Sequence, residues 1–294
     1  MTKVGILGTT GMLGSTLASY LTPLHDEVVE VNRIGLSVVR ENRVLKFDAT
    51  GTTSIKTHLQ KENFDFVINA VGLIKQHIDE KSERDIEEAY LVNSELPREL
   101  NEFAEQTSTP IIQIGTDCVY SGRSGNYSES SEFDCDDVYG LSKVSGEMKS
   151  KSLMTIRCSI IGHENKTPVS LMDWFLSQKE STAVKGYTNH YWNGVTTLSF
   201  ARVIDGIIRQ RTFSPGVAHL VPRGEISKFD LLDILAKKFG REDIEIHRFE
   251  TDLAINRTLT TLFPDKNAQF WQHAGYDKVP SISEIIEEYA KWSS

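Results

Sequence analysis

A tyrosine and a lysine stand four residues apart in the stretch VYGLSKVSGE, residues 138–147. If this stretch begins a helix, Tyr139 and Lys143 share one helical face, which also suits two ordinary surface residues. A phenol has a pKa near ~10, too high for easy proton exchange at neutral pH. A nearby ammonium group would lower that pKa, so that Tyr139 could exchange a proton with a substrate oxygen.

A threonine and an aspartate follow an apolar run in the stretch GTDCVYSG, residues 115–122. Ligands of open parallel sheets bind at the carboxyl ends of the strands, where Thr116 and Asp117 are expected. The Thr116 hydroxyl could hydrogen-bond a carbonyl oxygen on which charge develops. Cys118 comes next, and the sequence shows no sign of an activated thiolate there.

A glycine-rich loop, GTTGMLG, places Gly8, Gly11 and Gly14 between an expected strand and an expected helix. Glycines permit a tight turn and let backbone N–H groups at a helix N-terminus approach a pyrophosphate. The spacing between the first two glycines is one residue longer than in the Gly-x-Gly-x-x-Gly dinucleotide fingerprint. The alternative to a dinucleotide site is a turn whose glycines serve only helix–strand packing. The loop predicts a dinucleotide site that includes Thr10, Met12 and Leu13.

The second expected strand ends at Asn32 and Arg33, and no acid occupies its end. An acid there would bind the ribose 2′-hydroxyl, whereas an arginine accommodates a 2′-phosphate. Arg33 therefore indicates NADP(H), although it could also be a solvated loop residue. Glu30 lies too early in the strand to bind the ribose. Asp48 could contact the adenine, and the backbone of Ala70, Val71 and Gly72 could pass beside the cofactor.

Short apolar runs alternate with helical patterns through the first half of the chain. The expected strands are 3–8, 27–32, 43–47, 65–72, 110–116 and 153–161, and helices are expected at 11–21, 53–62 and 84–106. This alternation predicts an α/β fold with a Rossmann-type, doubly wound parallel sheet covered on both faces.

The second half predicts a smaller C-terminal substrate-binding lobe. Its expected helices are 170–178, 198–209, 227–239 and 282–291, its strands 217–221 and 244–247, and the stretch 186–194 is expected to be a loop. We expect an NADP-binding domain formed by 1–165 and 195–222, and a substrate lobe formed by 166–194 and 223–294.

Charge and composition argue against several classes of protein. A net charge of −9 argues against nucleic-acid binding, which leaves a basic footprint. No apolar run is long enough for membrane insertion, and the N-terminal stretch resembles a buried strand rather than a signal peptide, so we expect a cytoplasmic protein. Three cysteines without metal-type pairing predict neither a disulfide framework nor a metal site.

The glycine loop, NAVG (69–72), TDCVYSG (116–122) and YGLSK (139–143) occur in an order that resembles extended short-chain dehydrogenase/reductases. The nearest resemblance is to the dTDP-4-dehydrorhamnose reductase family, and it extends more weakly to 216–240 and 255–261. It implies Thr116, Tyr139 and Lys143 as catalytic residues, with Gly11, Met12 and Leu13 at the pyrophosphate. It also implies NADPH-dependent reduction of the 4-keto group of a nucleotide sugar in deoxysugar and surface-polysaccharide biosynthesis, and it is compatible with a homodimer.

Other activities occur in proteins of similar sequence. Related dehydratases carry an Asp–Glu pair after the threonine, and Cys118 stands where that glutamate would be, which disfavours dehydration. A nucleotide-sugar epimerase stays open, as does a non-catalytic subunit resembling the regulatory subunit of methionine adenosyltransferase. On the substrate side, the candidate ligands are Asp117, Cys118, Asn193 and Arg257. Asn193 could bind sugar hydroxyls or serve the packing of the lobe, and Arg257 could meet a phosphate or be a surface charge.

Overall fold

A parallel sheet of seven strands forms the centre of the molecule in the computed structural model, which describes residues 1–165 and 168–293. The strand order is β11-β6-β5-β4-β1-β2-β3. Their bounds are β1 Lys3–Leu7, β2 Glu27–Asn32, β3 Arg43–Lys46, β4 Phe66–Asn69, β5 Ile111–Ile114, β6 Leu153–Arg157 and β11 Gly216–His219. The order reverses between β1 and β4, the place where open parallel sheets bind their ligands.

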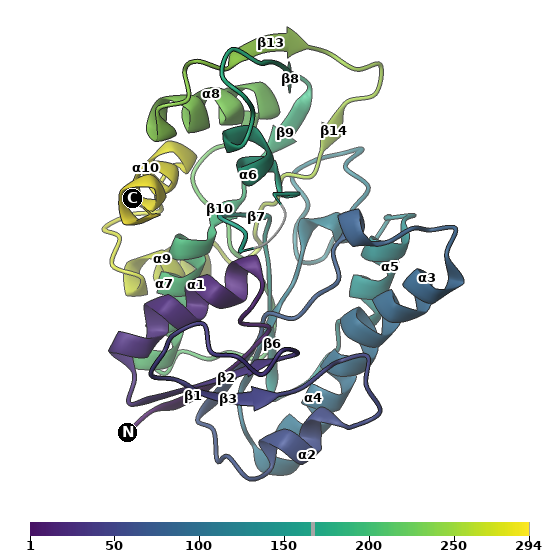
Figure 1. Cartoon of the computed structure of the whole chain (residues 1–294), viewed down its shortest axis with the longest axis vertical. Coiled ribbons are helices and arrows are strands. Elements are labelled where there is room, and N and C mark those ends of the chain that lie inside the picture. Colours follow the sequence, from purple (N-terminus) through teal and green to yellow (C-terminus); the bar gives the residue numbers. More distant parts are fainter. Residues whose placement is uncertain (166–167, 294) are drawn as a thin grey trace.

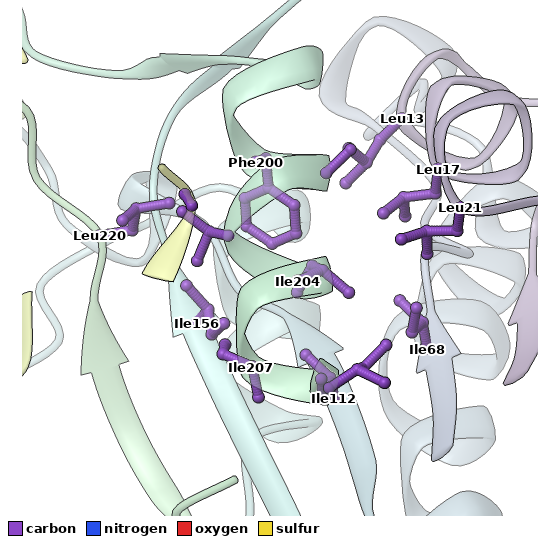
Figure 2. Close-up of a cluster of buried hydrophobic side chains, with 14 of the residues drawn as sticks. Leu13, Leu17, Leu21, Ile68, Ile112, Ile156, Phe200, Ile204, Ile207 and Leu220 are labelled. Carbon is purple, nitrogen blue, oxygen red and sulfur yellow. The ribbon is translucent and has the colours of Figure 1, made fainter. Parts of the chain in front are cut away.

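Helices cover both faces of this sheet, so its strands are continuous apolar runs (Figure 1). One face packs on α1 (Met12–Leu21), α7 (Thr197–Arg209) and α9 (Pro264–His273). Figure 2 shows Leu17 of α1, Ile204 of α7 and Ile68 of β4 in the same cluster of buried side chains. The other face packs on α2 (Ile55–Leu59) and α4 (Leu96–Thr107), beside which lie α3 (Glu83–Tyr90) and α5 (Val138–Ser145). The predicted Rossmann-type fold is confirmed.

Two predicted elements are each divided in the structure. The expected helix 84–106 consists of α3, a π-helical turn at Leu91–Glu95, and α4. The expected strand 153–161 ends as β6 at Arg157, and β7 (Ile160–Ile161) leaves the sheet to pair with β10 (Val195–Thr196). β7 leads into the C-terminal lobe, and β10 leads from it back to α7.

The lobe lies beyond the end of the sheet opposite the chain's N-terminus (Figure 1). A pair of strands, β8 (Ala183–Tyr187) and β13 (Glu245–Phe249), and a three-stranded sheet pack against its helices. The three-stranded sheet contains β9 (His190–Trp192), β12 (Ile226–Ser227) and β14 (Ile255–Asn256), and the helices are α6 (Leu171–Leu176), α8 (Lys228–Phe239) and α10 (Ile282–Ser293).

The prediction of a loop at 186–194 is wrong for most of that stretch. Its first residues end β8 and its centre forms β9, where Trp192 is buried and pairs with Ile226. The polar and aromatic composition that suggested a loop supplies instead a short strand whose partners lie far along the chain.

The C-terminal helices connect the lobe to the sheet. Phe270 and Trp271 of α9 pack into the core beneath the sheet, although the sequence indicated no helix there. In α10, Ile285 joins that core while Ile286 joins the core of the lobe. The division of the chain into 1–165 with 195–222 and 166–194 with 223–294 stays a prediction. α9, which that division gives to the lobe, packs on the nucleotide-binding sheet. In the described part of the chain, no helix combines the length and the apolarity needed to span a bilayer.

Candidate active site

The glycine loop is tightly folded at the end of β1. Gly8 adopts a φ of +83°, and its N–H donates to the Val31 carbonyl at 2.8 Å. A Cβ atom at Gly8 would lie 2.9 Å from the Ala70 carbonyl, and one at Gly14 would lie 2.1 Å from the Gly8 oxygen. A side chain at either position would collide with backbone, so glycine is required in this turn.

The loop leads directly into the N-terminus of α1. Gly11 is the N-cap residue, and no side chain caps this helix end. Its first N–H groups, on Met12 and Leu13, are thus left for water or a ligand, and the helix dipole favours an anion at that point. Thr10 lies half-buried in the same turn. A tight glycine turn with an uncapped helix behind it fits the pyrophosphate of a dinucleotide.

Asn32 braces the loop rather than facing a ligand. Its Nδ2 donates to Thr9 Oγ1 and to the Leu36 carbonyl, both at 2.9 Å, and its Oδ1 accepts from the Gly35 N–H. The buried amide of Asn32 thereby joins the end of β2 to the glycine loop.

Arg33 is exposed at the mouth of this region. The pKa of Asp48 is lowered, chiefly by hydrogen bonds from Thr50 and in smaller part by the charge of Arg33. The two residues predicted at the adenosine end therefore lie on the same side of the sheet, within electrostatic reach of each other.

Glu30 is fully buried and folds the loop that follows β2. Its carboxylate accepts from the backbone N–H groups of Val38 and Val39, from the Ser37 hydroxyl and from the Asn42 amide. This acid is used inside the protein and does not stand at the ribose position.

Thr116 caps the turn that follows β5. Its Oγ1 accepts from the Cys118 N–H at 3.1 Å, and the side chains of Thr116 and Asp117 are both buried. Thr116 also acts on Tyr139, whose pKa it lowers. The two groups predicted to act together are thus neighbours.

Lys143 lies one turn beyond Tyr139 on α5, as the helical spacing predicted. Asp137 caps this helix by accepting from the Gly140 N–H at 2.7 Å. Lys143 Nζ donates to the Ile114 carbonyl of β5 at 3.0 Å. A Cβ atom at Gly72 would lie 3.9 Å from the same Nζ, so the lysine lies between β5 and the loop that follows β4.

The expected lowering of the Tyr139 pKa is not found in the chain alone. Burial raises the pKa of Tyr139 well above its usual value, Cys118 and Asp117 add to this, and Thr116 opposes it. Burial also lowers the pKa of Lys143 to about 8, while Glu147 opposes that shift. At neutral pH the site therefore holds a phenol and an ammonium group.

Asn93 belongs to this site although the sequence analysis did not select it. It lies in the π-helical turn, where its Oδ1 accepts from the Leu73 N–H at 3.0 Å. Its Nδ2 donates to the Leu73 carbonyl and to the hydroxyl of Ser142 on α5. Asn93 therefore fixes the helix of Tyr139 to the loop of Ala70, Val71 and Gly72. Single-turn π-helices often mark functional sites, but they leave no clear signal in one sequence.

On the substrate side, Arg257 directly follows β14. Its Nε donates to the Tyr120 carbonyl at 2.8 Å, and its charge lowers the pKa of Asp117, which burial raises. Burial and Asp117 raise the pKa of Cys118 to about 12, which keeps it a thiol. Arg257, Asp117 and Cys118 are thus brought together.

Asn193 has a different role in the structure. Its Nδ2 donates to the Leu259 carbonyl at 2.7 Å, and its Oδ1 accepts from the Leu259 N–H at 2.9 Å. The amide holds the segment after Arg257 in place, and contact with a sugar hydroxyl stays a prediction.

Lys228 is a second residue that the sequence analysis did not identify. It is the first residue of α8 and acts electrostatically on Asp117, Cys118 and Arg257. A lysine is unfavourable at a helix N-terminus, and that conflict with the dipole was a signal available in the sequence.

Comparisons with known proteins show the family and the fold of the chain. Residues 2–263 match the family described as the RmlD substrate binding domain. The chain is 23% identical, over 278 residues, to a dTDP-4-keto-6-deoxy-D-glucose reductase from Streptomyces niveus, with 92% of this chain and 90% of that protein covered.

Two solved structures share the fold over nearly the whole chain. A dTDP-4-dehydrorhamnose reductase from Yersinia enterocolitica superposes with a TM-score of 0.77 at 18% identity, covering 99% of both chains. A dTDP-4-dehydrorhamnose reductase from Bacillus anthracis in complex with NADP gives 0.74 at 18% identity, covering 98% of this chain and 99% of the other.

Proposed function

The chain belongs to the RmlD substrate binding domain family, and from this premise we propose that it is an NADP-dependent reductase of nucleotide-activated sugars. Its substrate would carry a 4-keto group on a deoxysugar, as the name of the Streptomyces niveus relative indicates for that protein. The product would be a deoxysugar nucleotide of the kind used to build polysaccharides. A homodimer, a cytoplasmic location and the lack of a nucleic-acid partner stay predictions from the sequence.

One observation carries the proposal. Thr116 lies close enough to Tyr139 to lower its pKa, and Lys143, on the helix of Tyr139, donates to the carbonyl of Ile114, the last residue of β5. All three lie at the carboxyl end of the sheet, as does the glycine turn that follows β1. A hydroxyl, a phenol and an ammonium group beside a dinucleotide site are what carbonyl reduction requires.

The residues of this chain would handle the substrate oxygen. When bound, NADPH supplies the hydride that reduces the carbonyl carbon. The Tyr139 hydroxyl donates its proton to the carbonyl oxygen, so that a new O–H bond replaces the bond to the phenolic oxygen. The Thr116 hydroxyl donates a hydrogen bond to the same oxygen as negative charge develops on it. The Lys143 ammonium group stabilises the phenolate left on Tyr139.

The cofactor is proposed to be NADP(H) because Arg33 is exposed where a 2′-phosphate would lie, beside Asp48. Arg33→Ala should raise the dissociation constant of NADPH much more than that of NADH, as measured by fluorescence titration. Arg40→Ala is the matched control, since Arg40 is exposed on the same loop. Equal effects of Arg33→Ala on both cofactors would remove the argument for NADP.

Turnover is the direct test of the proposed reaction. Purified protein is mixed with NADPH and a panel of 4-keto-6-deoxy sugar nucleotides that differ in base, and loss of NADPH absorbance is followed. Oxidation with one member of the panel establishes the reductase and identifies the nucleotide.

A different result would favour the other activities. Tight NADP binding with interconversion of sugar epimers and no net oxidation would indicate an epimerase. Tight binding without any turnover, together with co-purification of a partner enzyme, would indicate a regulatory subunit. Cys118 does not favour a dehydratase, because its pKa near 12 prevents it from acting as a base at neutral pH.

A further inference from the structure

The three-stranded sheet of the lobe brings two cations to the substrate side of the site. Central strand β9 pairs with β12 on one side and with β14 on the other. Lys228 is the first residue after β12, and Arg257 is the first residue after β14. Lys228 therefore lies on one side of the three-residue strand β9 and Arg257 on the other, although the two residues are far apart in the chain.

Lys228 is mostly buried without a polar partner. Its Nζ lies 5.4 Å from the centroid of the Trp192 ring, and no hydrogen bond or ion pair to it occurs within residues 1–165 and 168–293. Burying a charge is costly unless it is paired, and a lysine in the first turn of α8 also opposes the helix dipole. Both costs would be offset by an anion bound beside this ammonium group.

The charges around Lys228 favour such an anion. Lys228 and Arg257 each lower the pKa of Asp117, and each lowers the pKa of His190, whose burial keeps it neutral. Burial lowers the pKa of Lys228 itself to about 8, and Asp117 opposes this. The cluster therefore contains two cations and one buried acid whose pKa is raised, with Cys118 as a thiol.

Arg257 is oriented for a ligand. Its Nε is held by the Tyr120 carbonyl, and its terminal nitrogens form no hydrogen bond within the described ranges. A guanidinium group fixed through Nε presents its two remaining nitrogens as a fork, which matches the geometry of phosphate oxygens.

We propose that Lys228 and Arg257 together form the subsite for the diphosphate of the substrate, with Lys228 as a binding residue. This inference rests on the proposed function, which supplies a nucleotide sugar as the substrate. Trp192 beneath the ammonium group would keep water away from its apolar side and restrict the lysine to this position.

Binding of dTDP, UDP, GDP and inorganic pyrophosphate to protein saturated with NADP⁺ tests the subsite. Prior saturation occupies the glycine loop, so that the calorimetric signal reports the second anion site alone. Lys228→Gln should weaken the tightest nucleoside diphosphate by roughly ten- to a hundredfold, the effect of losing one charge-assisted contact. Lys228→Arg should restore most of the affinity.

Lys237→Gln is the matched control. It removes the same charge from the last turn of the same helix, where Lys237 is exposed and paired with Asp233. The nucleoside thymidine, which lacks phosphate, should bind equally well to wild type and Lys228→Gln. Equal losses for thymidine and dTDP would show that Lys228 acts by packing on Trp192, which would overturn the inference.

The pH dependence gives an independent readout. Above pH 7.5 the phosphates are already ionised, since their second pKa is about 6. Affinity of the wild type should then fall as pH rises through about 8, as Lys228 loses its proton, whereas Lys228→Arg should show no such fall. His190 and Cys118 titrate outside this window, whereas Lys143 also has a pKa of about 8. The comparison is therefore made in protein that carries Lys143→Arg, where a fall that persists in Lys228→Arg would overturn the assignment to Lys228.

The outcomes separate this inference from the proposed function. A Lys228-dependent diphosphate site in a protein without keto-sugar turnover would sustain the subsite and reject the reductase. Turnover with unchanged diphosphate affinity in Lys228→Gln would sustain the reductase and reject the subsite. Failure of every diphosphate to bind to the NADP⁺-saturated protein would also reject it.

Discussion

Tyr139 meets the proposed substrate as a phenol, because burial beside Cys118 and Asp117 disfavours the phenolate. That protonation state suits reduction, in which the tyrosine must give a proton to the new alcohol. For the reverse reaction the tyrosine would first have to lose that proton. The raised pKa of Tyr139 therefore keeps the proton donor in place at neutral pH.

Tyr139→Phe removes the proton donor while keeping the ring. Turnover should fall by at least about 10²-fold, the usual size of an acid–base contribution, with NADPH affinity largely kept. Steady-state kinetics and a cofactor titration check both parts. Tyr90→Phe, at the end of α3 on the protein surface, should leave both unchanged. Undiminished turnover in Tyr139→Phe would remove Tyr139 from the mechanism.

The Lys143 ammonium group makes turnover sensitive to pH. Because its pKa is about 8, the group is charged below that pH and becomes neutral above it. The value of kcat should therefore fall as pH rises past about 8, and Lys143→Arg should move the fall to higher pH. We choose kcat because Lys228 would act on substrate binding. An unmoved inflection in Lys143→Arg would assign it to another group.

At the scale of elements, the strands and helices of the nucleotide-binding half could be predicted, since each is a local pattern. Buried strands such as β4 are short apolar runs, and Thr116 follows one of them directly. The lobe could not be predicted as well, because β9, β12 and β14 are two or three residues long and exist only as partners of one another. Lys228 and Asn93 were missed for the same reason, as their importance depends on distant neighbours.

Asn93→Ala tests the link that the π-helical turn provides. The change leaves the backbone of Leu73 and the hydroxyl of Ser142 without their buried partner, which should cost about 1–3 kcal/mol of unfolding free energy. Turnover should fall as well, because α5 would no longer be held against the 70–73 loop. Urea unfolding and kcat measure the two effects.

Asn101→Ala is the comparison, since that half-buried amide donates only to Glu105 of the same helix and its Oδ1 accepts no hydrogen bond from the described residues. It should change the unfolding free energy by no more than about 0.5 kcal/mol. If Asn93→Ala behaved like Asn101→Ala, the π-helical turn would have no part in fixing the site.

At the scale of the whole molecule, α9 and α10 make one cooperative unit of two cores. Trp271 is fully buried beneath the sheet, and its Nε1 donates to the Val221 carbonyl at 3.0 Å. α10 adds side chains to both cores from neighbouring positions. A loss of packing in either core is therefore transmitted to the other.

Trp271→Ala should destabilise the entire chain by about 3–5 kcal/mol. Thermal unfolding should remain a single transition at lower temperature, whether followed by circular dichroism or by loss of NADPH binding. Trp174→Ala, a partly exposed tryptophan on α6, should have a much smaller effect. Two separate transitions in the Trp271→Ala variant would show that the cores unfold independently.

The three-stranded sheet also sets an order of events during synthesis. Strands β1 to β4 leave the ribosome early, and the glycine turn can form as soon as its neighbours β2 and β4 are present. β9 must wait for β12 and then for β14, whose residues 255–256 are translated much later. Contacts this distant in sequence form slowly. The two cations on either side of β9 therefore come together only after residue 257 has been translated.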